Sequence, residues 1–155
     1  MGQEIERKFL VAGTSWKDGA ASTLIRQGYL SSTKERAVRV RVAGGKAFLT
    51  IKGATHGITR TEFEYPIPVD DAEAMLDALC ERPLIEKTRW AVVFAGFTWE
   101  VDEFHGKNAG LVVAEVELPS ADTTPQLPAW IREEVSLDPR YFNANLVKNP
   151  FNSWK

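Results

Sequence analysis

Hydrophobic and charged side chains alternate along most of this 155-residue chain, and this alternation is the feature that most limits its fold. Segments with a two-residue period are separated by turn residues, a pattern typical of antiparallel β-strands. We expect strands over residues 3–11, 23–31, 36–43, 46–53, 60–68, 84–95, 97–105 and 111–119. Gly44-Gly45, Ala95-Gly96 and the segment 105–110 are the expected turns between neighbouring strands.

Three segments have the spacing of amphipathic helices. The first covers residues 70–81: Asp70 and Glu73 fit a capping box, and Pro83 ends the helix. Its apolar face consists of Ala72, Met75, Leu76 and Leu79. We expect a second helix over 128–135, with Trp130 and Ile131 buried, and a third over 141–147. The fold class is therefore α+β and mainly antiparallel β: one domain over residues 1–155, an eight-stranded closed β-barrel with a few covering helices.

The charged side chains of seven expected strands fall on one face, because successive strand residues point to opposite faces. They comprise six cationic residues, Lys8, Arg39, Arg41, Lys52, Lys87 and Arg89, and eight carboxylates, Glu4, Glu6, Glu62, Glu64, Glu100, Asp102, Glu115 and Glu117. Any one strand fits an ordinary sheet whose charged face meets water. The set as a whole favours a barrel interior that binds ions, since runs such as Glu-x-Glu and Arg-x-Arg place like charges together at a cost in stability.

The mixture of charge signs indicates what such an interior would bind. Arginine and lysine suit phosphate oxygens, whereas carboxylates repel phosphate unless a hard cation such as Mg²⁺ or Mn²⁺ lies between them. Both signs together predict a metal–polyphosphate complex. Zinc is not expected, because the single Cys80 and the two histidines, His56 and His105, are isolated in the sequence.

Bulk properties narrow the function classes further. The chain has 19 basic and 21 acidic residues and a net charge of −2, which disfavours a nucleic-acid-binding module. No apolar run approaches the ~18 residues of a membrane span. A single cysteine excludes an internal disulfide and fits the reducing cytoplasm, the location we expect. Trp90, Trp99 and Trp130 are interpreted as apolar cover for the barrel, with the contact of a homodimer as the alternative.

An ordered series of segments carries a resemblance to a known family. The opening Glu4-Ile5-Glu6-Arg7-Lys8-Phe9 matches a Glu-x-Glu-x-Lys signature. It is followed by Gln27-Gly28-Tyr29-Leu30, Arg39-Val40-Arg41-Val42, Leu49-Thr50-Ile51-Lys52-Gly53, Glu62-Phe63-Glu64-Tyr65, Lys87-Thr88-Arg89 and residues 99–104 and 110–118, with Tyr141, Asn143 and Leu146 in a closing helix. The chain resembles the CYTH superfamily, also called triphosphate tunnel metalloenzymes.

The resemblance implies an eight-stranded tunnel, in agreement with the strand pattern, and a reaction on a triphosphate with Mg²⁺ or Mn²⁺. By position, the phosphate-binding residues would be Lys8, Arg39, Arg41, Lys52, Lys87 and Arg89. The metal ligands would be Glu4, Glu6, Glu64, Asp102, Glu115 and Glu117, and Glu62 and Glu100 would orient cations or hold metal.

Tyr29 is the expected general base. It lies on the Gln27 face of the second strand, which would place it near Lys8, whose ammonium group favours a phenolate able to take a proton from water. A core aromatic side chain is an equally good interpretation of this residue.

The favoured activity is hydrolysis of the terminal phosphoanhydride of inorganic triphosphate (tripolyphosphate), giving pyrophosphate and phosphate. The chain offers no appended domain and no evident pocket for a large organic group. Thiamine triphosphatase and class IV-type adenylate cyclase of the same family remain alternatives. So do a non-catalytic polyphosphate-binding module and a barrel with a structural role.

Overall fold

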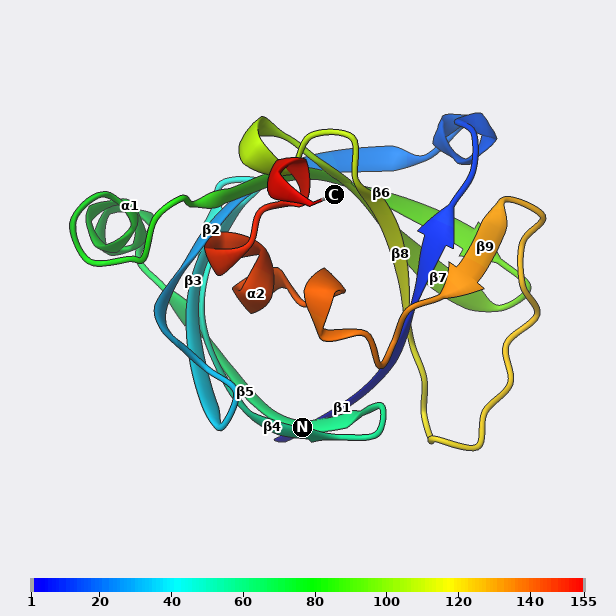
Figure 1. Ribbon diagram of the computed structural model, residues 1–155, viewed down its shortest axis with the longest axis horizontal. Helices are drawn as coiled ribbons and strands as arrows, with labels where there is room; N and C mark the ends of the chain where they lie inside the picture. The colour runs from blue at the N-terminus through cyan, green and yellow to red at the C-terminus, as the bar shows by residue number, and fades with distance from the viewer. Residues whose placement is uncertain (1, 155) are drawn as a thin grey trace.

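The structure is a computed structural model that describes residues 2–154, and its strands form a closed antiparallel barrel (Figure 1). The eight barrel strands are β1 (Gly2–Val11), β2 (Ala21–Thr33), β3 (Arg36–Ala43), β4 (Lys46–His56), β5 (Thr59–Ile67), β6 (Ile85–Phe94), β7 (Phe97–Phe104) and β8 (Val112–Glu117). They follow the order β5-β4-β3-β2-β6-β7-β8-β1, and pairing of β5 with β1 closes the ring. The predicted eight-stranded barrel is confirmed, with strand ends displaced by a few residues.

The expected hairpin turns have the backbone that their sequences favour. Gly44 and Gly45 connect β3 to β4 with φ angles of 57° and 81°, and Ala95 and Gly96 connect β6 to β7 with 50° and 84°. Two successive residues with positive φ match the twist of the flanking strands. The β7–β8 connection contains the short 3₁₀ helix η2 (Gly106–Asn108).

Helix α1 (Val69–Ala78) covers the outer face of β3 and β4. Its buried residues Ala72 and Leu76 pack against Val40 and Ala47. The helix is shorter than predicted, so Leu79 is exposed rather than part of the apolar face.

The predicted capping box at the start of α1 is wrong. Pro68 occupies the N-cap and no side chain caps the helix. Glu73 accepts a hydrogen bond from Arg26 of β2 at 2.8 Å, so its carboxylate is engaged with the barrel instead of the helix terminus.

The predicted helix over 128–135 is also wrong, because this segment forms strand β9 (Ile131–Glu134) on the outside of the ring. Phe9 and Val11 at the end of β1 pair with Glu134 and Ile131, so β9 satisfies backbone groups on the edge of β1 that β5 leaves free beyond Ile5. Ile131 is buried as expected, whereas Trp130 is only half-buried.

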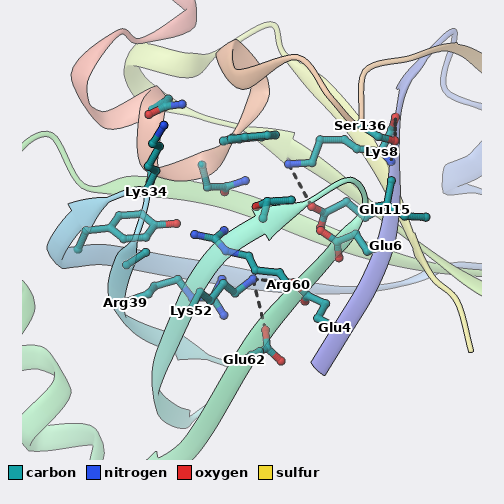
Figure 2. Close-up of a pocket in the computed structure, with 18 of the residues that line it drawn as sticks. Glu4, Glu6, Lys8, Lys34, Arg39, Lys52, Arg60, Glu62, Glu115 and Ser136 are labelled. Carbon is teal, nitrogen blue, oxygen red and sulfur yellow. Dashed lines mark hydrogen bonds and ion pairs between the residues drawn. The ribbon is translucent and has the colours of Figure 1, made fainter. Parts of the chain in front are cut away.

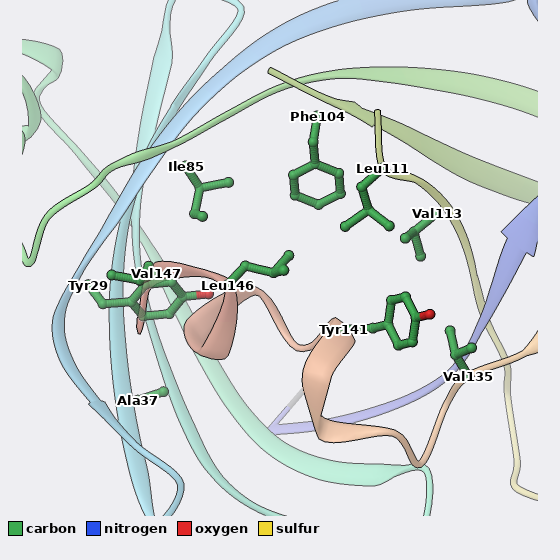
Figure 3. Packing of buried hydrophobic residues seen from close by; sticks show 10 residues of the cluster. All are labelled: Tyr29, Ala37, Ile85, Phe104, Leu111, Val113, Val135, Tyr141, Leu146 and Val147. Atoms are coloured by element: carbon green, nitrogen blue, oxygen red, sulfur yellow. The ribbon is translucent and has the colours of Figure 1, made fainter. Parts of the chain in front are cut away.

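The closing helix is confirmed as α2 (Asn143–Lys148), which follows the 3₁₀ helix η3 (Pro139–Tyr141). The sequence led us to expect cover for the outer face, but α2 lies within the ring of strands (Figure 1). Leu146 and Val147 pack inside the barrel with Tyr29 and Ile85 (Figure 3). Short 3₁₀ helices η1 (Ser15–Lys17) and η4 (Phe151–Ser153) complete the fold.

The outer face of β1, β7 and β8 is covered by β9 with its neighbouring segments and by Trp16 of η1, rather than by an α-helix. Trp99 is fully buried there and packs against Phe9 and Trp130, at ring-centroid distances of 5.6 and 6.1 Å. The apolar core thus lies on the outside of the barrel and at one of its ends, which leaves the rest of the interior to charged residues. No helix within residues 2–154 is long and apolar enough to cross a membrane.

Gly28 shows how closely the outer cover approaches β2. A Cβ atom at this position would lie 2.7 Å from Cδ2 of Leu84 and 2.8 Å from Cβ of Cys80. We predict that Gly28→Ala lowers the free energy of unfolding by about 1–3 kcal/mol through overpacking. Gly53→Ala is the matched strand control, since its Cβ would meet Thr61 at 3.4 Å. Equal melting temperatures for the two variants in circular dichroism would contradict this packing.

Candidate active site

The barrel encloses a cavity of about 550 Å³, here called the tunnel cavity, a size typical of small-molecule sites. Facing strands send charged side chains into it, as Figure 2 shows for Lys8, Arg39, Lys52 and Glu115. Thirteen of the fourteen charged residues predicted for the interior line it: Glu4, Glu6, Lys8, Arg39, Arg41, Lys52, Glu62, Glu64, Lys87, Arg89, Glu100, Glu115 and Glu117. The two-residue period thus identified which face of the sheet is internal.

Strand register places several opposite charges directly across from each other. Lys8 faces Glu115, and its ammonium lies 3.3 Å from that carboxylate. Lys52 of β4 faces Glu62 and contacts both Glu62 and Glu4, at 3.3 and 3.1 Å. Such pairing offsets part of the cost of removing charges from water.

Asp102 is the predicted site residue that does not line the tunnel cavity. It is 2% exposed and lies behind the cavity wall, where Arg89 donates two hydrogen bonds to it at 2.8 and 2.9 Å. The Lys87 ammonium lies 2.7 Å from the same carboxylate. Burial alone would raise the pKa of Asp102, but Arg89 and Lys87 more than offset it and hold the pKa below its ordinary value. Asp102 therefore orients two cationic side chains.

The cationic side chains crowd one another. Burial, together with the charges of Arg39 and Arg89, lowers the pKa of Arg41. Burial, reinforced by Arg89 and Arg41, outweighs Asp102 and lowers the pKa of Lys87 to about 7. Arg39 also has a buried Nε–H without a hydrogen-bond partner among residues 2–154. An anion with several oxygens would relieve this repulsion and supply acceptors.

The carboxylates also lie close to one another, so their negative charges repel. The register places Glu6 across from Glu117 and Glu100 across from Glu115, two like-charge pairs. Burial, together with Glu115 and Glu4, raises the pKa of Glu6 well above its ordinary value. Burial and Glu4 likewise raise the pKa of Glu62. A divalent cation beside Glu6 would remove this repulsion.

The donor set fits Mg²⁺ or Mn²⁺, which take oxygen ligands. Within residues 2–154, no three carboxylates are grouped closely enough to form a complete metal site by themselves. This arrangement suits Mg²⁺, which is usually held by one or two carboxylates and completes its coordination with water and substrate phosphates. Glu4 and Glu6 are the candidates placed together at the start of β1 (Figure 2).

Tyr29 lies at the boundary between the apolar end of the barrel and the tunnel cavity. Its ring is 5% exposed and belongs to the apolar cluster of Figure 3, yet the residue also lines the tunnel cavity. Its hydroxyl makes no hydrogen bond to the described part of the chain. The Lys8 ammonium donates instead to the carbonyl oxygen of Tyr141, at 3.1 Å.

Several cavity residues were missed from the sequence. Arg60 shares the inward face of β5 with Glu62 and Glu64, so extending the two-residue period by one step would have found it. Lys34 lies in the β2–β3 turn, and Ser136 follows β9, where strand periodicity gives no signal. Phe142, Asn143 and Asn145 reach the cavity from the α2 segment, whose position inside the barrel only the structure reveals.

Comparison with known proteins agrees with this geometry. A CYTH domain matches residues 2–147. The inorganic triphosphatase of Acetivibrio thermocellus is 54% identical over 155 residues, which cover 100% of this chain and 99% of that protein. The inorganic triphosphatase of Nitrosomonas europaea is 39% identical over 149 residues, covering 93% and 96%. A crystal structure of an inorganic triphosphatase superposes with a TM-score of 0.68 at 36% identity, covering 93% of this chain and 97% of the other. The chain therefore belongs to the CYTH family.

Proposed function

We propose that this protein is a divalent-cation-dependent inorganic triphosphatase that hydrolyses tripolyphosphate to pyrophosphate and phosphate. The observation that carries the proposal is the tunnel cavity, in which crowded cations and crowded carboxylates share one small enclosed space. Full-length relatives at 54% and 39% identity bear the name inorganic triphosphatase, which favours this activity over the thiamine triphosphatase and cyclase alternatives.

The basic residues of the cavity hold the substrate in this proposal. Arginine donates paired hydrogen bonds to phosphoryl oxygens, and lysine supplies a compact charge. The binding set is Lys8, Arg39, Arg41, Lys52, Lys87 and Arg89, with Lys87 and Arg89 oriented by Asp102. Six cations distributed around a closed barrel can contact all three phosphoryl groups of an extended triphosphate.

The carboxylates that line the cavity are the proposed metal ligands, with Glu4 and Glu6 foremost and Glu64, Glu115 and Glu117 as further candidates. When bound, the cation would supply a Lewis acid that polarises phosphoryl oxygens. Glu115 also neutralises Lys8, and Glu64 lies 3.6 Å from Arg39, so both have a second role in placing cations.

In the reaction, a water oxygen forms a bond to the terminal phosphorus while the bond from that phosphorus to the bridging oxygen breaks. Pyrophosphate leaves with the bonding electron pair, and the basic residues stabilise the negative charge that develops on it. We propose that Tyr29 is the general base that takes the proton released by the attacking water, and that Lys8 contacts the phosphoryl group being transferred.

Phosphate release from tripolyphosphate, ATP and thiamine triphosphate tests the function directly. With Mg²⁺ or Mn²⁺ we expect release from tripolyphosphate well above the other two, and none in EDTA. Arg39→Ala should lower kcat/KM by about 10- to 100-fold through loss of charge-assisted hydrogen bonds. Arg132→Ala on β9 is the control, since the Arg132 side chain is exposed and donates to backbone oxygens of its own segment. Equal rates for all three substrates, or activity unaffected by EDTA, would overturn the assignment.

Glu6 should show a conflict between stability and function. In Glu6→Gln a neutral amide replaces a carboxyl group whose ionisation is disfavoured by burial and by Glu115 and Glu4. We therefore expect a melting temperature in EDTA raised by roughly 2–4 °C, about 1 kcal/mol. Phosphate release should fall at least about tenfold because a metal ligand is missing. Glu35→Gln, at the exposed β2–β3 turn, should change neither quantity. A destabilised but fully active Glu6→Gln protein would refute both roles.

Tyr29→Phe tests the proposed base while preserving the ring that packs in the barrel. Loss of general-base catalysis should lower kcat by about 100-fold or more, with little change in KM or melting temperature. Tyr65→Phe, at an exposed position on β5, is the matched control. Full activity in Tyr29→Phe would show that Tyr29 is only a core residue.

A further inference from the structure

Residues 141–143, where the C-terminal segment enters the barrel, contact the basic side chains of the tunnel cavity. The carbonyl oxygen of Tyr141 accepts a hydrogen bond from Lys8, and the Phe142 ring lies 5.8 Å from the same ammonium. Asn143 Oδ1 accepts from Lys87 Nζ at 2.9 Å. Three consecutive residues thus hold two of the six proposed phosphate-binding side chains.

Asn143 is connected to a third cationic side chain through Gln27, which is completely buried. Gln27 Nε2 donates to Asn143 Oδ1 at 3.0 Å, and Gln27 Oε1 accepts from Arg41 Nε at 2.8 Å. The amide oxygen of Asn143 therefore holds Lys87 directly and holds Arg41 through Gln27.

The orientation of both amide groups follows from their neighbours. An arginine side chain can only donate hydrogen bonds, so the atom facing Arg41 must be the oxygen of Gln27. The Gln27 Nε2 group then faces Asn143 as a donor, so the atom that Asn143 turns toward Gln27 and Lys87 must be its oxygen. The Asn143 Nδ2 group is consequently turned away from Lys87. It has no hydrogen-bond partner within residues 2–154, although Asn143 lines the tunnel cavity.

We propose that Asn143 contacts the substrate: its Nδ2 donates a hydrogen bond to a phosphoryl oxygen while its Oδ1 holds Lys87 and Gln27 in place. The inference rests on the proposed triphosphatase function and adds α2 to the site. Leu146 and Val147 are buried against Tyr29 and Ile85, which anchors the helix and keeps the amide in position. The α2 segment is therefore part of the binding site as well as packing for one end of the barrel.

Asn143→Asp separates the two roles of the amide. A carboxylate keeps both acceptor contacts, to Lys87 and to Gln27, but replaces the Nδ2 donor with an oxygen that repels phosphate. We expect an unchanged or higher melting temperature, a KM for tripolyphosphate raised about 10- to 100-fold, and a similar loss of tripolyphosphate affinity in calorimetry with EDTA present. Asn143→Leu, which removes donor and acceptor, should lose affinity as well and also lower the melting temperature.

Asn152→Asp is the matched control, because this exposed asparagine lies on η4 and introduces the same charge outside the cavity. Its kinetics and affinity should equal those of the natural protein. Natural KM and affinity in Asn143→Asp, with a loss only in Asn143→Leu, would overturn the substrate contact and leave a structural amide. A natural protein that neither hydrolyses nor binds tripolyphosphate would instead overturn the function itself, so the two failures are distinguishable.

Discussion

The cost of enclosing fourteen ionisable side chains in one barrel governs this structure. Removing charges from water costs stability unless opposite charges are paired. The register supplies Lys8 with Glu115 and Lys52 with Glu62, and Asp102 supports two cationic residues from behind the wall. Repulsion remains among the cationic side chains and, separately, among the carboxylates. A bound polyanion would relieve the first and a divalent cation the second.

The apolar parts of the fold follow from this interior. Because the barrel cannot use its centre as a hydrophobic core, the outward-facing residues need cover. Helix α1 covers β3 and β4, and strand β9 with its neighbouring segments covers β1, β7 and β8. At the end of the barrel beneath α2 the interior is apolar, and there Tyr29 belongs to both the packing and the cavity. Apart from that end, the apolar packing and the charged cavity thus occupy opposite faces of the same strands.

Strand periodicity predicted the barrel and nearly all charged cavity residues. Successive residues of a strand point to opposite faces of the sheet, so the local sequence shows which side chains share the inner face. It could not predict that 131–134 is a strand, since the buried Ile131 and Val135 are also spaced as in a helix. The pairing of β9 with the end of β1 decided between the two structures. Nor could periodicity show that Asp102 lies behind the wall or that Asn143 enters the cavity, because both depend on contacts between distant segments.

The charged interior of the barrel is the site where we propose that a metal–triphosphate complex binds. A crystal structure with Mn²⁺ and a triphosphate whose bridging oxygens are replaced by methylene groups would test it most directly. We predict phosphoryl density among Lys8, Arg39 and Lys87, with an anomalous Mn²⁺ peak beside Glu4 and Glu6. An empty tunnel cavity, or a triphosphate bound outside the barrel while the protein is active, would contradict this account.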